Sequence, residues 1–231
     1  MSVLKSMYYV VLYSHQLVVS FSPKVNCSNI LSVVAKLLGM DYDKSTDTKL
    51  LAIHRVIWDK TNYQKYNYEI VRRLPESTES FTKIFIMREP LDRALSGLLY
   101  SVTYGNKGRP QQTLIDFFIT HFNKNHHLGR QVNDADLKIG WDHVFDISQF
   151  EEFIVAVETV TGIKIDRPTL NSKHWNKYND KPTGNYKLVK DVRDCKNLSR
   201  RITDYFTADE IATIREMLKT DLEFYHSKIK G

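Results

Sequence analysis

The chain has 231 residues, of which 42% are hydrophobic, 12% aromatic and 26% charged, and its formal net charge is +6. This composition excludes a disordered chain and indicates a soluble globular protein, which we expect to form a single domain over residues 1–231. The positive charge favours an anionic partner. Because no long unbroken run of lysines and arginines stands out, we expect no nucleic acid as partner.

The cysteine content and the early apolar segments bear on the compartment. Cys27 and Cys195 lie far apart in the sequence, which argues against a disulfide framework and favours a reduced setting. The early apolar run from Tyr8 to Tyr13 is too short to span a bilayer. We therefore expect a cytoplasmic protein without an integral membrane segment, or the soluble domain of a membrane-anchored enzyme.

A strand, a polar turn and a helix are the first elements that the pattern predicts clearly. Leu17 to Phe21 is a short apolar run typical of a buried parallel strand, and apolar residues recur at helical spacing from Ile30 to Leu38. The turn between them contains Lys24, and Ser28 or Asn29 is expected to cap the helix. The positive end of the helix beside a lysine favours a bound phosphate or sulfate. An ordinary connection with a solvated lysine is the alternative.

A second strand and helix follow the same plan. Ile84 to Met87 is apolar, and Arg88 follows at the carboxyl end of this predicted strand. Pro90 suits the first turn of the next helix, whose apolar residues recur from Leu91 to Val102. Ser96 lies on a face of this helix away from the leucines. The second strand thus delivers an arginine, and its helix presents a hydroxyl nearby.

The rest of the chain completes a layered arrangement. Residues 142–148 predict a third strand, followed by a helix that stops at Gly162, and a capping box at 207–210 opens the last helix. Residues 168–190 are polar and predict a long loop. The alternation of strands and helices predicts an α/β fold with a parallel sheet.

Two motifs point to a family. Gly-x-x-x-x-Gly-Lys-[Ser/Thr] is absent, which disfavours a standard P-loop kinase. Instead, Pro23-Lys-Val-Asn-Cys-Ser-Asn29 resembles the 5'-phosphosulfate loop of sulfotransferases, and Arg88-Glu-Pro-Leu-Asp-Arg-Ala-Leu-Ser96 resembles their 3'-phosphate motif. The form is most similar to the carbohydrate sulfotransferases of HNK-1 and chondroitin 4-O type, whose loop reads roughly Pro-Lys-Val-x-Cys-Thr-Asn-Trp. Here Ser28 and Ile30 take the places of the threonine and the tryptophan.

Two further segments resemble this family more weakly. His127-Leu-Gly-Arg-Gln131 resembles its His-x-x-Pro-Gln segment, with Arg130 in place of the proline. The run from Asp221 to Tyr225 resembles the acidic and aromatic end of its last helix.

The resemblance implies a three-layer P-loop-NTPase-like fold with a parallel sheet flanked by helices, and 3'-phosphoadenosine-5'-phosphosulfate (PAPS) as the sulfuryl donor. The acceptor would be a hydroxyl of a glycan or small molecule, and transfer would be in line, without a metal. Lys24 would stabilise the leaving group, while Arg88 and Ser96 would bind the 3'-phosphate. For Arg93 we expect only surface ion pairing with Glu89 or Asp92. The 5'-phosphate would be bound by the loop and its backbone N–H groups, from Val25, Asn26, Cys27, Ser28 and Asn29.

An acceptor hydroxyl needs a base, and two histidines are candidates. His54 follows the phosphate loop at about the distance where several sulfotransferases place a base, and His127 lies in the weakly similar segment. The neighbouring pair of His126 and His127 has no second pair at ligand spacing, so zinc is not predicted.

Two other classes of function remain open from the residues. A Mg²⁺-dependent nucleotide or small-molecule kinase with a degenerate phosphate loop would need an acidic metal ligand, for which Asp146 is the candidate. A non-catalytic polyanion- or RNA-binding module would use the Tyr- and Lys-rich region from Lys60 to Tyr68.

Overall fold

The computed structural model describes residues 8–40, 49–105, 111–122, 124–166, 186, 188–194, 198 and 201–230. Most of the predicted loop at 168–190, and Cys195, lie outside these residues. The chain divides into two compact units. We call residues 7–87 and 139–170 the sheet unit, and residues 1–6, 88–138 and 171–231 the helical unit.

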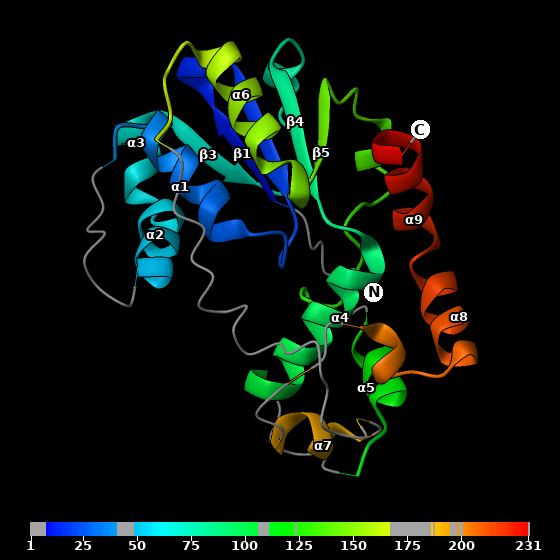
Figure 1. Ribbon diagram of the computed structural model, residues 1–231. Helices are drawn as coiled ribbons and strands as arrows, with labels where there is room; N and C mark the ends of the chain where they lie inside the picture. The colour runs from blue at the N-terminus through cyan, green and yellow to red at the C-terminus, as the bar shows by residue number, and fades with distance from the viewer. Residues whose placement is uncertain are drawn as a thin grey trace. The chain divides into compact units, whose positions relative to one another are not determined.

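The sheet unit contains a five-stranded mixed sheet with the order β3-β1-β2-β4-β5 (Figure 1). Its strands are β1 (Tyr8–Leu12), β2 (Leu17–Phe21), β3 (Tyr68–Val71), β4 (Thr82–Met87) and β5 (His143–Asp146). The strand predicted at 17–21 and those predicted near 84–87 and 142–148 are therefore confirmed.

The expected parallel sheet is confirmed for three strands, whereas the side of the sheet that contains β1 and β3 is antiparallel. β2, β4 and β5 are parallel, but β1 pairs antiparallel with both β2 and β3. A single short turn that includes Tyr13–His15 joins β1 to β2. A parallel pair needs a crossover of about a dozen residues or more, so this connection permits only a hairpin.

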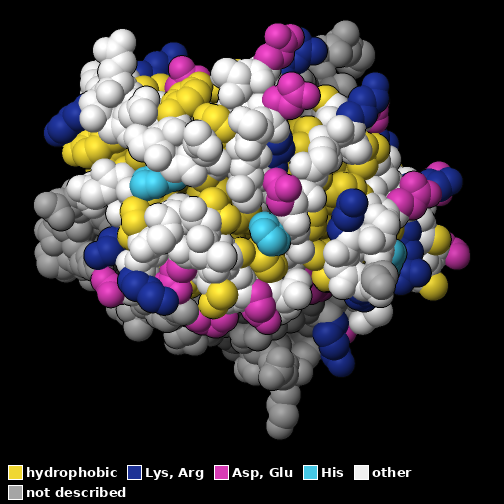
Figure 2. Space-filling model, turned by 90° about the horizontal axis from the view of Figure 1, so that it is seen from above, with side chains coloured by type: hydrophobic (Ala, Val, Ile, Leu, Met, Phe, Trp, Pro, Cys, Tyr) yellow, Lys and Arg dark blue, Asp and Glu magenta, His cyan; other side chains and the backbone are white. Residues whose placement is uncertain are grey.

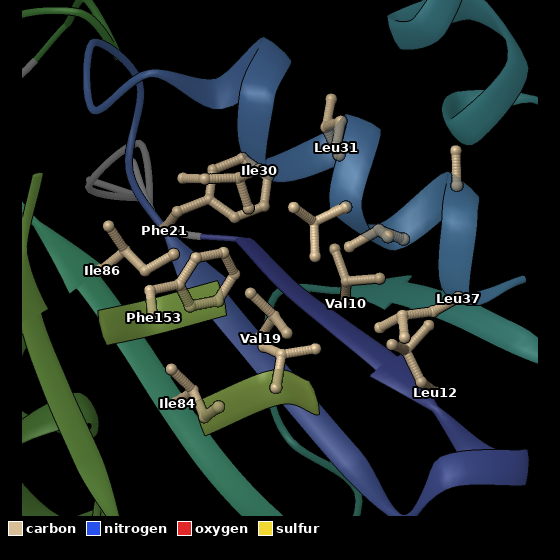
Figure 3. Packing of buried hydrophobic residues seen from close by; sticks show 14 of the residues in the cluster. Val10, Leu12, Val19, Phe21, Ile30, Leu31, Leu37, Ile84, Ile86 and Phe153 are labelled. Carbon is tan, nitrogen blue, oxygen red and sulfur yellow. The ribbon is translucent and has the colours of Figure 1, made fainter. Parts of the chain in front are cut away.

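One apolar core joins the sheet to the helices of this unit, α1 (Cys27–Leu37), α2 (Lys49–Trp58) and α6 (Phe150–Thr161). Figure 3 shows Ile30 and Leu31 of α1 and Phe153 of α6 packed over the sheet. The sheet residues in this core share one face, because they alternate along each strand: Val10, Leu12, Leu17, Val19, Phe21, Ile84 and Ile86. These helices thus form one layer over that face, and a short helix, α3 (Thr61–Tyr66), precedes β3.

The opposite face of the sheet is also closed. Tyr9 and Phe85 are buried there, and the Trp141 ring packs on both, with centroid distances of 6.3 and 5.1 Å. The structure therefore establishes an α/β fold, with one helical layer described in the sheet unit.

The helical unit has its own core. Its elements are α4 (Pro90–Tyr100), a π-helical turn (Ser101–Gly105), α5 (Leu114–His121), α7 (Val189–Asp194), α8 (Ala208–Met217), α9 (Lys219–Tyr225) and a second π-helical turn (His226–Lys230). Pro90 is the first residue of α4, and Thr207 and Glu210 form the capping box of α8, both as predicted. No helix among the described residues is long and apolar enough to cross a membrane.

Candidate functional site

The turn after β2 has an unusual backbone. Lys24 and Asn26 both have left-handed backbones, with φ of 72° and 62°, although neither is glycine. Such residues are uncommon and each requires support from its surroundings. Val25, between them, is fully buried and belongs to the core of the sheet unit. Val25 thus anchors the turn in this core, while Lys24 next to it is only half-buried.

Helix α1 begins two or three residues earlier than expected. Its N-cap is Asn26, which makes no capping hydrogen bond through its side chain, so the prediction of Ser28 or Asn29 as cap is wrong. The left-handed backbone of Asn26 turns the chain into the helix directly, and its carbonyl accepts from the N–H groups of Asn29 and Ile30. The Ser28 hydroxyl is therefore available for another partner.

The thiol of Cys27 lies at the start of α1, where backbone N–H groups of the turn act on its ionisation. Burial raises the pKa of this thiol, and the backbone N–H groups of Val25, Lys24 and Cys27 act in the opposite direction. The thiol donates to the carbonyl of Ser22 at 3.3 Å. Several N–H groups that point to one spot at a helix N-terminus are the usual setting for an anion.

His54 contacts this helix start. Its Nε2 atom lies 3.4 Å from Oγ of Ser28, and the ring is half-buried on α2. Burial lowers the pKa of His54, which favours the neutral imidazole. The structure thus brings together a predicted base and a predicted phosphate ligand from two separate helices.

The second motif begins where β4 ends. β2 and β4 are neighbouring parallel strands, and Phe21 pairs with Ile86. The turn that carries Lys24 therefore leaves the sheet at the edge from which Met87 leads to Arg88. In open α/β sheets, ligands bind outside the carboxyl ends of the parallel strands.

Gln131 brackets the backbone of Arg88. The N–H of Arg88 donates to Oε1 of Gln131 at 3.1 Å, and Nε2 of Gln131 donates to the Arg88 carbonyl at 2.7 Å. Gln131 is fully buried, whereas the side chain of Arg88 is half-buried. This bracket was not predicted.

Arg93 is a buried structural residue, and the expectation of surface ion pairing is wrong. Its side chain is 0% exposed and donates to the carbonyls of Gly129 and His126. Four residues further along α4, Gly97 packs directly against His127, because a Cβ atom there would lie 2.0 Å from the His127 carbonyl oxygen. Ser96, the predicted 3'-phosphate ligand, is half-buried beside this contact.

His127 lies in a different setting from His54. Its ring contacts the rings of Tyr100 and His126, with centroid distances of 4.6 and 4.0 Å. These residues line a shallow hollow of about 450 Å³ in the helical unit, together with Tyr104, His121, Lys124 and Asn125. Over the described ranges, no group of three or more His, Cys, Asp or Glu residues is arranged to hold a metal ion.

Asp221 is the second functional candidate that the sequence reading missed. It is fully buried on α9, and its carboxylate accepts from the N–H groups of Gln131 at 2.7 Å and Val132 at 3.0 Å. Burial raises the pKa of Asp221 to about 6, while these two N–H groups and the charges of Arg93 and Arg130 act against that rise. The only signal in the sequence was the weak resemblance of both segments to one family.

No family model, curated protein or solved structure matches the chain in the comparisons made.

Proposed function

We propose that the protein is a PAPS-dependent sulfotransferase with the three-layer P-loop-NTPase-like fold of that class. The observation that carries the proposal is the pairing of β2 with β4. Each of these parallel strands is followed at its carboxyl end by a cationic residue, Lys24 or Arg88, in a motif that resembles half of a PAPS site. One doubly phosphorylated nucleotide would satisfy both motifs.

The turn after β2 would bind the 5'-phosphate. The N–H groups from Val25 to Ser28 and the positive end of α1 supply donors and charge, and the Ser28 hydroxyl supplies one more. The N–H of Asn29 already donates to the Asn26 carbonyl at 3.0 Å, so its contribution is the smallest of the predicted set. The N–H groups of Val25, Lys24 and Cys27, which favour negative charge on the Cys27 sulfur, support this role.

Lys24 would act at the bond that breaks. Transfer of the sulfuryl group in line leaves negative charge on the bridging oxygen of the nucleotide, and a fixed cation there is worth several kcal/mol, about as much as an oxyanion-hole donor. The left-handed backbone of Lys24 supports the assignment, because strain of this kind clusters at functional sites.

Arg88 and Ser96 would bind the 3'-phosphate. An arginine offers a planar fork of donors that fits two phosphate oxygens, and the hydroxyl adds a neutral donor. This contact would distinguish the donor from nucleotides that lack the 3' group.

His54 is the better candidate for the base. It contacts Ser28 at the start of α1, beside the turn that would hold the sulfuryl donor, and its lowered pKa favours the neutral ring, which can accept a proton. His127 belongs to the hollow of the helical unit and is the second choice. The acceptor would be a glycan or small molecule that bears a hydroxyl.

The kinase alternative gains no specific support. The carboxylate of Asp146 accepts from the N–H and hydroxyl of Ser148 at 2.8 and 2.6 Å, within a capping box that Gln149 completes. Such engagement weighs against Asp146 as a Mg²⁺ ligand.

The RNA-binding alternative gains none either. Tyr68 is buried and donates to the Ile57 carbonyl, so this ring packs in the core instead of presenting a stacking surface. On the face in Figure 2, basic side chains are interspersed with acidic ones.

Calorimetric titration tests the proposal. We expect adenosine 3',5'-bisphosphate to bind about tenfold or more tightly than adenosine 5'-monophosphate, because charge-assisted hydrogen bonds to the 3'-phosphate are lost in the second ligand. Arg88→Ala should remove that difference. Equal affinity of the unmodified protein for both nucleotides would refute the assignment.

A further inference from the structure

We propose that Gln131 and Asp221 are positioning residues for Arg88, and that they form a hydrogen-bonded relay from α9 to the start of the 3'-phosphate motif. This inference rests on the proposed role of Arg88 as a nucleotide ligand. Neither residue is assigned to contact the nucleotide.

The first link is needed because the sheet ends before Arg88. The last pair in the ladder between β4 and β5 joins Met87 to Asp146, so the backbone of Arg88 lies just beyond it. The side-chain amide of Gln131 supplies both partners instead, since it accepts from the Arg88 N–H and donates to its carbonyl. One buried side chain therefore fixes the plane of the peptide groups on either side of the Arg88 Cα atom.

The second link fixes Gln131 itself. Both carboxylate oxygens of Asp221 are used, Oδ2 by the N–H of Gln131 and Oδ1 by the N–H of Val132. Asp221 lies 90 residues further along the chain, so the bracket on Arg88 depends on the seating of α9. Two cations act on this carboxylate, Arg93 from α4 and Arg130 from the same segment.

The segment that carries Gln131 is anchored to α4 as well. Arg93 donates to the carbonyls of Gly129 and His126, and Gly97 lets the His127 backbone approach the helix closely. The same helix bears Ser96, so one rigid body would hold both proposed ligands of the 3'-phosphate. A site of this kind requires its ligands within about 0.5 Å of their working positions.

A purely structural network would not need to end on Arg88. Buried carboxylates and amides carry a desolvation penalty, and apolar side chains of similar volume often stabilise a protein as well or better. Gln131 and Asp221 are both fully buried, and orientation of a functional arginine would account for two polar side chains at these positions. At metal sites, loss of such outer-shell partners reduces affinity or activity about 10- to 100-fold, and we expect a loss on the same scale here.

The test uses the full chain and four variants. Gln131→Ala removes both hydrogen bonds to Arg88. Gln131→Glu keeps an acceptor for the Arg88 N–H but loses the donor to the Arg88 carbonyl. Asp221→Asn weakens the second link. Ile214→Ala is the matched control, because Ile214 is buried in the core of the helical unit and its truncation destabilises the protein without removing a bond of the relay.

Calorimetry with adenosine 3',5'-bisphosphate and adenosine 5'-monophosphate gives the decisive readout, and thermal denaturation shows that each variant is folded. We expect Gln131→Ala to weaken bisphosphate binding about tenfold or more and monophosphate binding less than about twofold. The affinity of Gln131→Glu for the bisphosphate should lie between those of Gln131→Ala and the unmodified protein. Ile214→Ala should retain the full preference for the bisphosphate over the monophosphate.

The outcomes separate two failures. A preference for the bisphosphate that is unchanged in folded Gln131→Ala overturns the relay but leaves the proposed function standing. If Gln131→Ala does not fold, Gln131→Glu takes its place, and an unchanged preference there overturns the relay equally. Absence of any preference in the unmodified protein refutes the proposed function itself.

Discussion

The Nε2 atom of His54 lies 3.4 Å from Oγ of Ser28, which links α2 to the first turn of α1. This contact joins a titratable ring to the turn that carries Lys24. Nε2 accepts a hydrogen bond from the Ser28 hydroxyl when it bears no proton, and donates one when it is protonated. The pH behaviour of His54 is therefore the first property to measure.

We expect His54 to titrate below its ordinary pKa of 6.5, because burial disfavours the charged imidazolium. Below about pH 6.5 the unfolded chain would take up a proton at His54 before the folded protein does, so acidification lowers stability through this group. NMR titration of the histidine ring signals, with His54→Gln for assignment, gives the value directly. A midpoint at or above 6.5 would contradict the burial argument.

The left-handed backbone of Asn26 predicts a difference between two small substitutions. Asn26→Ala should lower the free energy of unfolding by up to about 1 kcal/mol, because alanine tolerates a φ of 62° less well than asparagine does. Asn26→Gly should change it by less than about 0.5 kcal/mol, since glycine adopts this conformation freely. Urea denaturation of both variants measures the difference, and equal stabilities would argue against the turn described here.

Two glycines offer a matched pair for the packing of α4. Gly97→Ala places a Cβ atom 2.0 Å from the carbonyl oxygen of His127, so the segment must move, and we expect a loss of about 1–3 kcal/mol. Gly140→Ala meets no atom within 4 Å and should be neutral or slightly stabilising. The two unfolding free energies, measured side by side, should differ clearly. Similar values would mean that His127 does not lie against α4.

Asp221 should make stability fall as pH rises. Its pKa is raised from 3.8 to about 6, so between these values the folded protein holds a proton that the unfolded chain has lost, and this contribution decreases by up to about 3 kcal/mol. Relative to the unmodified protein, Asp221→Asn should therefore gain stability between about pH 4 and pH 6. Urea denaturation across that range measures the difference. A gap that stays constant with pH would show that the pKa of Asp221 is not raised.

Local patterns predicted the elements that depend on neighbours in sequence. The apolar run at Leu17–Phe21 matches β2, Pro90 opens α4, and Gly162 ends α6 with a φ of 69°. These features follow from strand burial, a fixed proline backbone and the freedom of glycine, which are all properties of a few residues.

Features set by distant contacts were not predictable in this way. The direction of β1 depends on its pairing with β2 and β3, and no period in its own residues encodes that choice. The relay from Asp221 through Gln131 to Arg88 joins residues up to 133 positions apart. The sequence predicted Arg93 at the surface, because charged side chains are seldom fully buried unless they are paired.

The central claim is that one nucleotide contacts both motifs, and binding of the two halves of its phosphate pattern tests it most directly. Calorimetry with adenosine 5'-monophosphate, adenosine 3'-monophosphate and the 3',5'-bisphosphate would be carried out on Ser28→Ala and Arg88→Ala. We predict that Ser28→Ala weakens only the ligands with a 5'-phosphate, that Arg88→Ala weakens only those with a 3'-phosphate, and that the two monophosphates compete for one site. Simultaneous binding of both monophosphates, or equal losses for all three ligands in either variant, would contradict a single nucleotide site.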